Sequence, residues 1–243
     1  MKPFLLLASR AEDDAAEDEY RAYLRYAGLA AEQLYRIRME AAPLPDLELS
    51  EYSGVIVGGS PFTSSDPAGQ KTAVQHRVER QLAALLDRIV AADFPFFGAC
   101  YGVGTLGLHQ GALIDRTYGE GLGGVTVSVT EEGLMDPLLK GLPQSFTAFV
   151  GHKEACTVLP GHAVLLASSA NCPVQMFRIR TNLYATQFHP ELDADGLTTR
   201  IDIYRHAGYF PPDSAEELMD LARQHSVTEP MKILRNFVER YAR

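Results

Sequence analysis

Residues 94–102 read Phe-Pro-Phe-Phe-Gly-Ala-Cys-Tyr-Gly, a short apolar run that ends at a cysteine held between two glycines. The run has the length of a buried strand, and glycines on both sides of Cys100 allow the tight turn that carries a strand into a helix. This is the cysteine form of the nucleophile elbow, G-x-C-x-G in place of G-x-S-x-G. At the amino end of a helix, the dipole and the free N–H groups favour thiolate over thiol. The stretch therefore predicts a reactive sulfur at the carboxyl end of a strand.

Two other interpretations of this stretch are open. A lone cysteine in an apolar sequence is usually a small buried hydrophobic residue, although that role gives no reason for glycines on both sides. Residues 102–107 read Gly-Val-Gly-Thr-Leu-Gly, which spells the G-x-G-x-x-G of dinucleotide-binding proteins. That motif normally follows the first strand and expects an acid about twenty residues later, but Glu120 falls short and Glu131 overshoots. We therefore expect neither a dinucleotide nor any other cofactor.

The composition is that of a globular protein. With 243 residues, 46% of them hydrophobic and 22% charged, the chain can bury a substantial core. Its formal net charge of −9 and the lack of a basic run argue against nucleic-acid binding. It has no long apolar span and no leader pattern, so we expect neither membrane insertion nor secretion. Three cysteines without regular spacing suit a reducing compartment, which favours the cytoplasm.

Apolar runs and amphipathic stretches alternate along the chain. Strands are expected at residues 4–8, 34–37, 55–57, 94–99, 125–129, 146–150, 164–167, 174–178 and 184–188. A first helix should end at Gly28, a long amphipathic helix over residues 70–92 should lead into the Cys100 strand, and a further helix should follow over residues 101–110. This alternation predicts an α/β fold with a mostly parallel central sheet, helices on both faces, and a site at the carboxyl strand ends.

The last fifty residues change character. Residues 214–217 read Ser-Ala-Glu-Glu, a capping box, and Thr228 with Pro230 marks another helix start. We therefore expect an α/β domain over residues 1–195 and a C-terminal helical extension over residues 196–243. The apolar face of the extension can pack on the domain or bind a partner, and the sequence does not separate these roles.

A second motif supplies a base for the sulfur. Residues 187–191 read Gln-Phe-His-Pro-Glu and follow an expected strand. A cysteine nucleophile needs a histidine base with an acid that orients it. His189 and Glu191 lie two apart on an extended chain and project on the same side, so Glu191 can hold the imidazole while His189 faces Cys100. Alone the motif also fits a surface turn, but with Cys100 it predicts a catalytic triad.

These motifs together resemble the class I, triad-type glutamine amidotransferases, and among them the stand-alone proteins similar to the glutaminase domain of GMP synthase. The resemblance runs along roughly residues 1 to 192. It rests on Gly58-Gly59-Ser60-Pro61, Gly98-Ala99-Cys100-Tyr101-Gly102, Gly151-His152-Lys153-Glu154, Val158-Leu159-Pro160, Leu166-Ala167-Ser168-Ser169, Cys172-Pro173 and Gln187-Phe188-His189-Pro190-Glu191. It implies a flavodoxin-like sheet.

The resemblance also implies a reaction. Cys100 would attack the side-chain amide of glutamine and become a γ-glutamyl thioester, while His189 would protonate the departing ammonia and then activate water. Glu191 would fix the orientation of His189. The backbone N–H groups of Gly59 and Tyr101 would form the oxyanion hole. In the family the ammonia passes to an ATP-dependent synthetase, and since this chain shows no P-loop, the synthetase would be a separate partner.

One position departs from the family's pattern. The elbow usually continues G-x-C-x-G-x-Q, where the glutamine helps to bind substrate, but Gly104 stands there. A missing hydrogen bond to the substrate should loosen the selection for free glutamine. The other substrate-binding candidates that the resemblance implies are Gly58, Ser60, His152 and Gln187. For His152 a loop hydrogen bond is an equally open role, and Glu154 is given no role.

Three functions therefore compete. The first is a glutamine-hydrolysing amidotransferase, and the second is a γ-glutamyl hydrolase or peptidase that uses the same triad on another γ-glutamyl compound. The third is a weakly catalytic regulatory module, against which the intact triad argues. We expect no metal, because the set of His152, Cys156, His162 and Cys172 has neither a C-x-x-C pair nor zinc-type histidine spacing.

Overall fold

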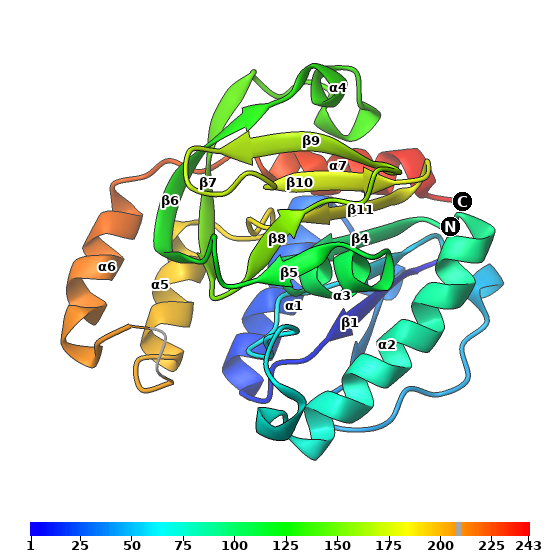
Figure 1. Ribbon diagram of the computed structural model, residues 1–243, viewed down its shortest axis with the longest axis horizontal. Helices are drawn as coiled ribbons and strands as arrows, with labels where there is room; N and C mark the ends of the chain where they lie inside the picture. Colours follow the sequence, from blue (N-terminus) through cyan, green and yellow to red (C-terminus); the bar gives the residue numbers. More distant parts are fainter. Residues whose placement is uncertain (208–209) are drawn as a thin grey trace.

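Strands form the centre of the computed structural model, which describes residues 1–207 and 210–243. They are β1 (Phe4–Ala8), β2 (Leu34–Arg38), β3 (Val55–Val57), β4 (Phe96–Ala99), β5 (Leu113–Asp115), β6 (Glu120–Val129), β7 (Ser145–His152), β8 (Ala155–Val158), β9 (Ala163–Ser169), β10 (Met176–Ile179) and β11 (Leu183–Thr186). Among the described residues, nine strands make one sheet in the order β2-β1-β3-β4-β11-β10-β9-β6-β7 (Figure 1), and β5 pairs with β8 in a second, small sheet.

The large sheet has a parallel half and an antiparallel half. Strands β2, β1, β3, β4 and β11 run parallel to one another. From β11 the order continues through β10, β9, β6 and β7, all in antiparallel pairs. The carboxyl ends of parallel strands meet at one edge, so β3, β4 and β11 deliver the segments that follow them to the same place. The prediction of an α/β fold with a mostly parallel sheet is confirmed.

Helices cover both faces of this sheet. They are α1 (Asp13–Ala27), α2 (Ala73–Ala92), α3 (Tyr101–His109), α4 (Glu131–Leu134), α5 (Ala194–Ile203), α6 (Ala215–Arg223) and α7 (Met231–Tyr241). Buried residues of α2 and α3 share one hydrophobic layer with the sheet, and those of α1 and α7 share the layer on its other face. Helices α5 and α6 stand beside β6 and β7 (Figure 1), where they bury a third cluster.

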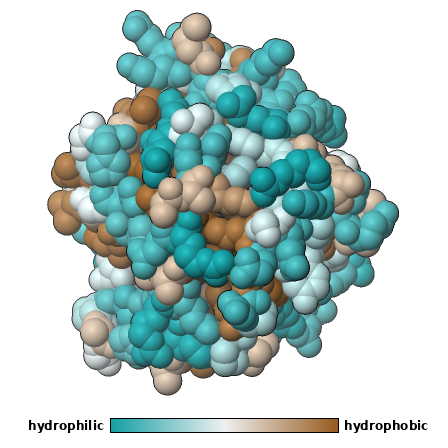
Figure 2. All heavy atoms as spheres, turned by 90° about the vertical axis from the view of Figure 1, so that its right-hand side faces the viewer, coloured by the Kyte–Doolittle hydropathy of each residue, from teal (hydrophilic) through white to brown (hydrophobic). Residues whose placement is uncertain are grey.

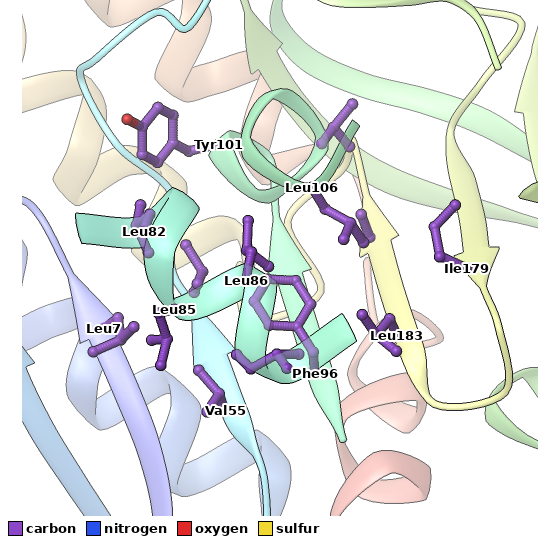
Figure 3. Close-up of a cluster of buried hydrophobic side chains, with 14 of the residues drawn as sticks. Leu7, Val55, Leu82, Leu85, Leu86, Phe96, Tyr101, Leu106, Ile179 and Leu183 are labelled. Atoms are coloured by element: carbon purple, nitrogen blue, oxygen red, sulfur yellow. The ribbon is translucent and has the colours of Figure 1, made fainter. Parts of the chain in front are cut away.

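The two main layers follow from the alternation of side chains along each strand. Leu5 and Leu7 of β1 point toward α2 and α3, whereas Phe4 and Leu6 point toward α1 and α7. Figure 3 shows the first layer, in which Tyr101 lies at the start of α3, above side chains from α2 and the strands. Burial of each such leucine or phenylalanine stabilises the fold by about 1.5–3 kcal/mol. These strands are buried on both sides, so their sequence is continuously apolar.

Local signals for helix ends are partly confirmed. Gly28 ends α1 with a φ of 71°, the left-handed conformation that glycine adopts without strain. The capping box expected at Ser214 is wrong, because no side-chain hydrogen bond caps α6 there. The chain enters α6 through a 3₁₀ turn over Pro212–Ser214, which leaves Ser214 with a φ of −88° and a ψ of 0°. A serine cap needs extended backbone angles, so its hydroxyl cannot accept from the first turn.

Hydrophilic residues dominate one face of the molecule. Figure 2 shows that the face seen at the right of Figure 1 is covered mostly by hydrophilic residues, with hydrophobic ones gathered in small patches between them. Among the described residues, no helix has the length and apolar character needed to cross a membrane.

Candidate active site

Cys100 lies at the junction of β4 and α3, where the chain turns sharply. Its φ is 51° and its ψ is −83°, a conformation that a non-glycine residue adopts only when the surroundings enforce it. Its backbone N–H donates to the carbonyl of Thr186 at the end of β11, at 2.7 Å. A Cβ on Gly98 would come within 2.6 Å of the Gly102 Cα, so the turn requires glycine at 98. Close approach of strand and helix therefore explains Gly98, whereas a Cβ on Gly102 would meet nothing within 4 Å.

The thiol of Cys100 is partly exposed, but its surroundings are poorly solvated. Burial raises the pKa of Cys100 to about 12, although the guanidinium groups of Arg10 and Arg200 act in the opposite direction. Burial thus favours the thiol, in opposition to the effect expected of the helix dipole. The sulfur needs a base that removes its proton during the reaction.

His189 and Glu191 form a buried pair on the segment after β11. The Nδ1 atom of His189 lies 2.8 Å from Glu191 Oε1, and the two residues are 6% and 1% exposed. The backbone N–H of His189 donates to the carbonyl of Phe149 in β7, at 3.0 Å. If Nδ1 carries the proton and donates it to Glu191, the lone pair of His189 is left on Nε2. This is the arrangement expected for a base oriented by an acid.

Two buried arginines complete the surroundings of this pair. Arg200 of α5 donates from Nη2 to Glu191 Oε1 at 2.9 Å, and its Nη1 lies 3.2 Å from His189 Nδ1. Arg10, which follows β1, donates from Nε to Glu19 Oε1 at 2.9 Å. Both arginines are almost fully buried. Each arginine therefore neutralises a buried carboxylate.

Two cavities flank the sulfur of Cys100. The first is lined by Arg10, Ser60, Cys100, Leu122, Val150, Gly151, His189, Leu192, Leu197, Arg200 and Tyr204. The second is lined by Ser60, Phe62, Thr63, Cys100, Tyr101, Gly151, His152, Lys153, Glu154 and Gln187. The cysteine and the histidine of the expected triad thus face one cavity. The charged residues Lys153 and Glu154 face the other, where an amino acid's carboxylate and ammonium could be bound.

The loop after β3 packs closely on the site. A Cβ on Gly59 would lie 2.6 Å from His189 Cε1 and 2.8 Å from Arg10 Nη2, so only glycine fits there. Gly58 packs on Glu19 instead, and its N–H donates to the Leu7 carbonyl at 3.1 Å. The structure thus brings Gly59 to the base and turns the N–H of Gly58 away from it.

The other expected site residues surround the sulfur. Ser60 lines both cavities, and its hydroxyl accepts from the Phe62 N–H at 3.0 Å. The side-chain amide of Gln187 lies 4.0 Å from Cys100 Sγ. Tyr101 occupies the first turn of α3, where backbone N–H groups have no partner within the helix. The oxyanion hole formed by the N–H groups of Gly59 and Tyr101 stays a prediction.

The space beside Gly104 is already filled. A Cβ on Gly104 would lie 2.4 Å from Ser64 Oγ and 2.7 Å from Glu154 Oε1. The Glu154 carboxylate accepts the backbone N–H groups of Ser64 and Ser65, at 2.8 and 2.6 Å. Glu154 thus holds the loop that fills the space beside Gly104, and glycine is the residue that this packing requires.

We expect substitutions at Gly104 to be destabilising. Gly104→Ala should lower the free energy of unfolding by about 1–3 kcal/mol through overpacking, although alanine favours a helix by about 1 kcal/mol over glycine. Gly104→Gln should be worse, and Ser64→Gly should partly restore either variant. Gly102→Ala is the matched control in α3, because a Cβ there meets nothing within 4 Å. Urea unfolding measures all of these, and equal midpoints for the two alanine variants would contradict the packing argument.

The buried pair should make stability depend on pH. Burial lowers the pKa of His189 below its usual value of 6.5. Burial opposes the charge of Glu191, but His189 and Arg200 outweigh it and hold the pKa of Glu191 below its usual value of 4.5. The unfolded chain therefore binds more protons than the folded one at both groups, so stability falls as the pH falls.

We expect two limbs in this loss of stability. The first should begin as the pH falls through 6.5 and should be absent in His189→Gln, and the second should begin below 4.5 and should be absent in Glu191→Gln. Urea midpoints measured between pH 8 and pH 4 test this, with the exposed His162→Gln as a control that keeps both limbs. A wild-type midpoint that does not fall between pH 7.5 and pH 5.5 would contradict the first limb.

Sequence reasoning missed four residues of the site. Arg10, Arg200 and Tyr204 line the cavity of Cys100 and His189, and Glu154 anchors the loop beside Gly104. Arginines and tyrosines are common on surfaces, and no local pattern marks the ones that fold inward. Arg200 and Tyr204 also lie beyond residue 195, in the segment expected to be a separate extension. Only Glu154 had a signal, its place within the Gly-His-Lys-Glu motif.

Comparison with known families matches most of this chain. The family of class-I glutamine amidotransferases matches residues 18–200. One subunit of the glutamine-hydrolysing GMP synthase of Thermoplasma volcanium is 34% identical over 114 residues, which are 46% of this chain and 55% of that protein. The corresponding GMP synthase subunit of Methanococcus maripaludis is 28% identical over 144 residues, 59% of this chain and 66% of that protein. The matches thus span about half to two thirds of these relatives.

Solved structures share the fold over nearly the whole chain. A glutamine amidotransferase from Thermotoga maritima has a TM-score of 0.77 at 20% identity, covering 99% of this chain and 98% of that one. One from Methylobacillus flagellatus has a TM-score of 0.72 at 17% identity, covering 100% of this chain and 96% of that one.

Proposed function

The chain belongs to the class-I glutamine amidotransferase family, and from that premise we propose that it hydrolyses the side-chain amide of glutamine through a γ-glutamyl thioester on Cys100. The observation that carries this proposal is the buried hydrogen bond of 2.8 Å between His189 and Glu191, in a cavity that the Cys100 thiol also lines. A histidine held by a carboxylate beside a cysteine is suited to nucleophilic attack on an amide.

The first half of the reaction transfers the γ-glutamyl group to sulfur. His189 takes the proton of Cys100, and the sulfur attacks the amide carbon as that proton leaves. The negative charge on the carbonyl oxygen is held by the N–H groups of Gly59 and Tyr101. The carbon–nitrogen bond then breaks, and the proton on His189 passes to the leaving nitrogen, which departs as ammonia.

The second half returns the enzyme to its starting state. Water enters on the side that ammonia has left, and His189 accepts one of its protons while the oxygen attacks the thioester carbon. The carbon–sulfur bond breaks, glutamate forms, and the proton returns from His189 to Cys100. Because burial raises the pKa of the Cys100 thiol, the first half of the reaction requires His189 to remove the thiol proton.

A partner and a compartment follow from this proposal. The relatives from Thermoplasma and Methanococcus are GMP synthase subunits, so we propose that the ammonia serves an ATP-dependent synthetase on a separate chain. Three free thiols fit a reducing compartment, for which we propose the cytoplasm.

A second candidate, a γ-glutamyl hydrolase with the same triad, is favoured by the packing at Gly104. Ser64 and Glu154 fill the space of the glutamine side chain that the family uses for substrate. The α-amino end of the substrate would then meet the Glu154 carboxylate, and the amine on the other side of the bond could be larger than ammonia. A hydrolase of this kind needs no synthetase.

Glutamate release and active-site labelling test the function. The protein is incubated with glutamine, alone and with lysate, and with a panel of γ-glutamyl amides and dipeptides. Labelling by an electrophilic glutamine analogue should appear on Cys100 by mass spectrometry and should persist in Cys156→Ser, which removes a buried thiol outside both cavities. Preference for a larger leaving amine would select the hydrolase, and no turnover of any compound without Cys100 labelling would reject both.

A further inference from the structure

Three side chains of metal-binding type converge at one end of the antiparallel half of the sheet. Glu120 begins β6 and His152 ends β7, and the two are direct partners in the strand register. Cys172 comes from the turn between β9 and β10. The ligand atoms of the three residues all lie within 4.8 Å of one another. The set contains neither Cys156 nor His162.

The hydrogen bonds of His152 place its Nε2 atom against a carboxylate oxygen. Its Nδ1 lies 2.9 Å from the Glu154 carbonyl oxygen, which accepts only if Nδ1 carries a proton. In the neutral ring, Nε2 is then an acceptor, yet it lies 3.0 Å from Glu120 Oε2, another acceptor. Two acceptors at this distance need a proton or a cation between them. A histidine that donates its other N–H to a backbone carbonyl is also the usual form of a metal ligand.

Among the described residues, the Glu120 carboxylate has hydrogen-bond partners on only one of its two oxygens. Its Oε2 accepts from Gln175 Nε2 at 2.7 Å, whereas its Oε1 is buried with no hydrogen-bond partner among the described residues. The same Nε2 atom of Gln175 lies 3.1 Å from Ser169 Oγ. If the Gln175 amide were flipped, its oxygen would face the Glu120 carboxylate, so Nε2 is the atom that points there. Gln175 is fully buried and therefore fixes Glu120. A buried carboxylate oxygen without a partner is costly unless a cation uses it.

Cys172 supplies the soft ligand. It is fully buried, and its thiol donates a hydrogen bond to the Val174 carbonyl at 3.5 Å. A bound divalent metal deprotonates a coordinating thiol outright.

We propose that Glu120, His152 and Cys172 bind a zinc ion through a carboxylate oxygen, Nε2 and Sγ, with water as the fourth ligand. A mixed set of thiolate, imidazole and carboxylate suits zinc, whose bonds to these atoms are about 2.0–2.3 Å long. A tetrahedral ion with such bonds holds its ligand atoms about 3.2–3.7 Å apart. His152 Nε2 and Glu120 Oε2, which are 3.0 Å apart, would separate slightly, whereas Cys172 Sγ, within 4.8 Å of them, would move in by at most about 1 Å. The thiol proton, and any proton shared between Nε2 and Glu120, is released to solvent.

This ion would be structural. It would tie the start of β6, the end of β7 and the β9–β10 turn together, and it would touch no reacting atom. His152 also lines the second cavity beside Lys153 and Glu154, so the ion would hold the loop that faces the α-amino end of the substrate.

Cobalt binding tests the site independently of catalysis. The full chain with Cys100→Ser keeps only Cys156 and Cys172 as thiols, and it is stripped with a chelator and titrated with Co²⁺. We expect about one equivalent to bind, with the near-ultraviolet charge-transfer band of a cobalt–thiolate bond. In the Cys100→Ser background, the further substitution Cys172→Ser should abolish the band and weaken cobalt binding at least about 100-fold. The further substitution Cys156→Ser should change neither the band nor the cobalt affinity. Glu120→Gln should weaken binding with the band retained at saturation.

Zinc retention and thermal unfolding give a second measurement that needs no variant. Zn²⁺ added to the stripped wild-type protein should raise its melting temperature, and the purified protein should carry about one zinc by elemental analysis. Absence of any cobalt band together with no thermal shift would overturn the proposal. A band that survives Cys172→Ser and disappears in Cys156→Ser would also overturn it, because the metal would then lie elsewhere.

Discussion

Replacing Cys100 with alanine should lower kcat for glutamine or any γ-glutamyl substrate by roughly 10⁴-fold or more, because no other group can form the thioester. The structure offers no substitute nucleophile with the same geometry. Cys156 and Cys172 are buried and line neither cavity beside the sulfur. The backbone of Cys100 has a φ of 51°, so alanine should leave the fold intact or slightly strained in the same way.

Trapping of the intermediate distinguishes this loss from a loss of binding. Acid quench of the wild-type protein during turnover should yield a mass increase of one γ-glutamyl group on the peptide that contains Cys100. Cys100→Ala should show none, and Cys156→Ala should match the wild type in both rate and adduct. Turnover by Cys100→Ala within a factor of ten of the wild-type rate would refute the triad proposal.

Replacing Arg200 with methionine should destabilise the protein by about 3–5 kcal/mol, the usual cost of removing one partner from a buried ion pair. Arg200 Nη2 lies 2.9 Å from Glu191 Oε1, and the two side chains are 7% and 0% exposed. Without the guanidinium, Glu191 keeps the hydrogen bond from neutral His189 but loses the positive charge that faces its carboxylate. Arg200→Met with Glu191→Gln should recover part of the stability, because the lone buried charge is then gone.

Arg200 should also act as a positioning residue for the base. We expect Arg200→Met to raise the pKa of Glu191 and to move the acidic limb of the pH–kcat profile, an effect that a merely structural role would not produce. Arg200→Lys keeps the charge and should restore the profile in part. Arg205→Met is the matched control, because its ion pairs with Asp202 and Glu216 lie at the surface, where solvent screens them. If the pH–kcat profile of Arg200→Met is unchanged, Arg200 contributes to stability and does not position the base.

Most of the fold could be predicted from the sequence, because the strands and helices have local signals. The first strand at Phe4–Ala8 and the strand at Val55–Val57 match residue for residue, since both are short, continuous apolar runs. The strand β6 was expected only from Val125, but it begins at Glu120. Its first residues include three glycines and a glutamate, which do not resemble a strand, and it is their pairing with β7 that extends it. The strands β5 and β8 were missed because each is short and pairs outside the main sheet.

The residues of the site also divide into those with a local sequence signal and those without one. Cys100, His189 and Glu191 stand in motifs with a local reason for each residue, and the structure places them around one buried hydrogen bond and one cavity. The contacts of Arg10, Arg200 and Glu154 join residues that are far apart in sequence, and only the folded chain shows them. The cluster of Glu120, His152 and Cys172 is of the same kind, because register and a turn, not spacing, bring its members together.

The nucleophile and its base are anchored to opposite halves of the sheet. The N–H of Cys100 is fastened to the end of β11 in the parallel half, whereas the N–H of His189 is fastened to Phe149 of β7 in the antiparallel half. A shift of β7 relative to β11 would therefore change the distance between the Cys100 sulfur and the His189 imidazole. A misplacement of about 1 Å at reacting groups can cost about 100-fold in rate.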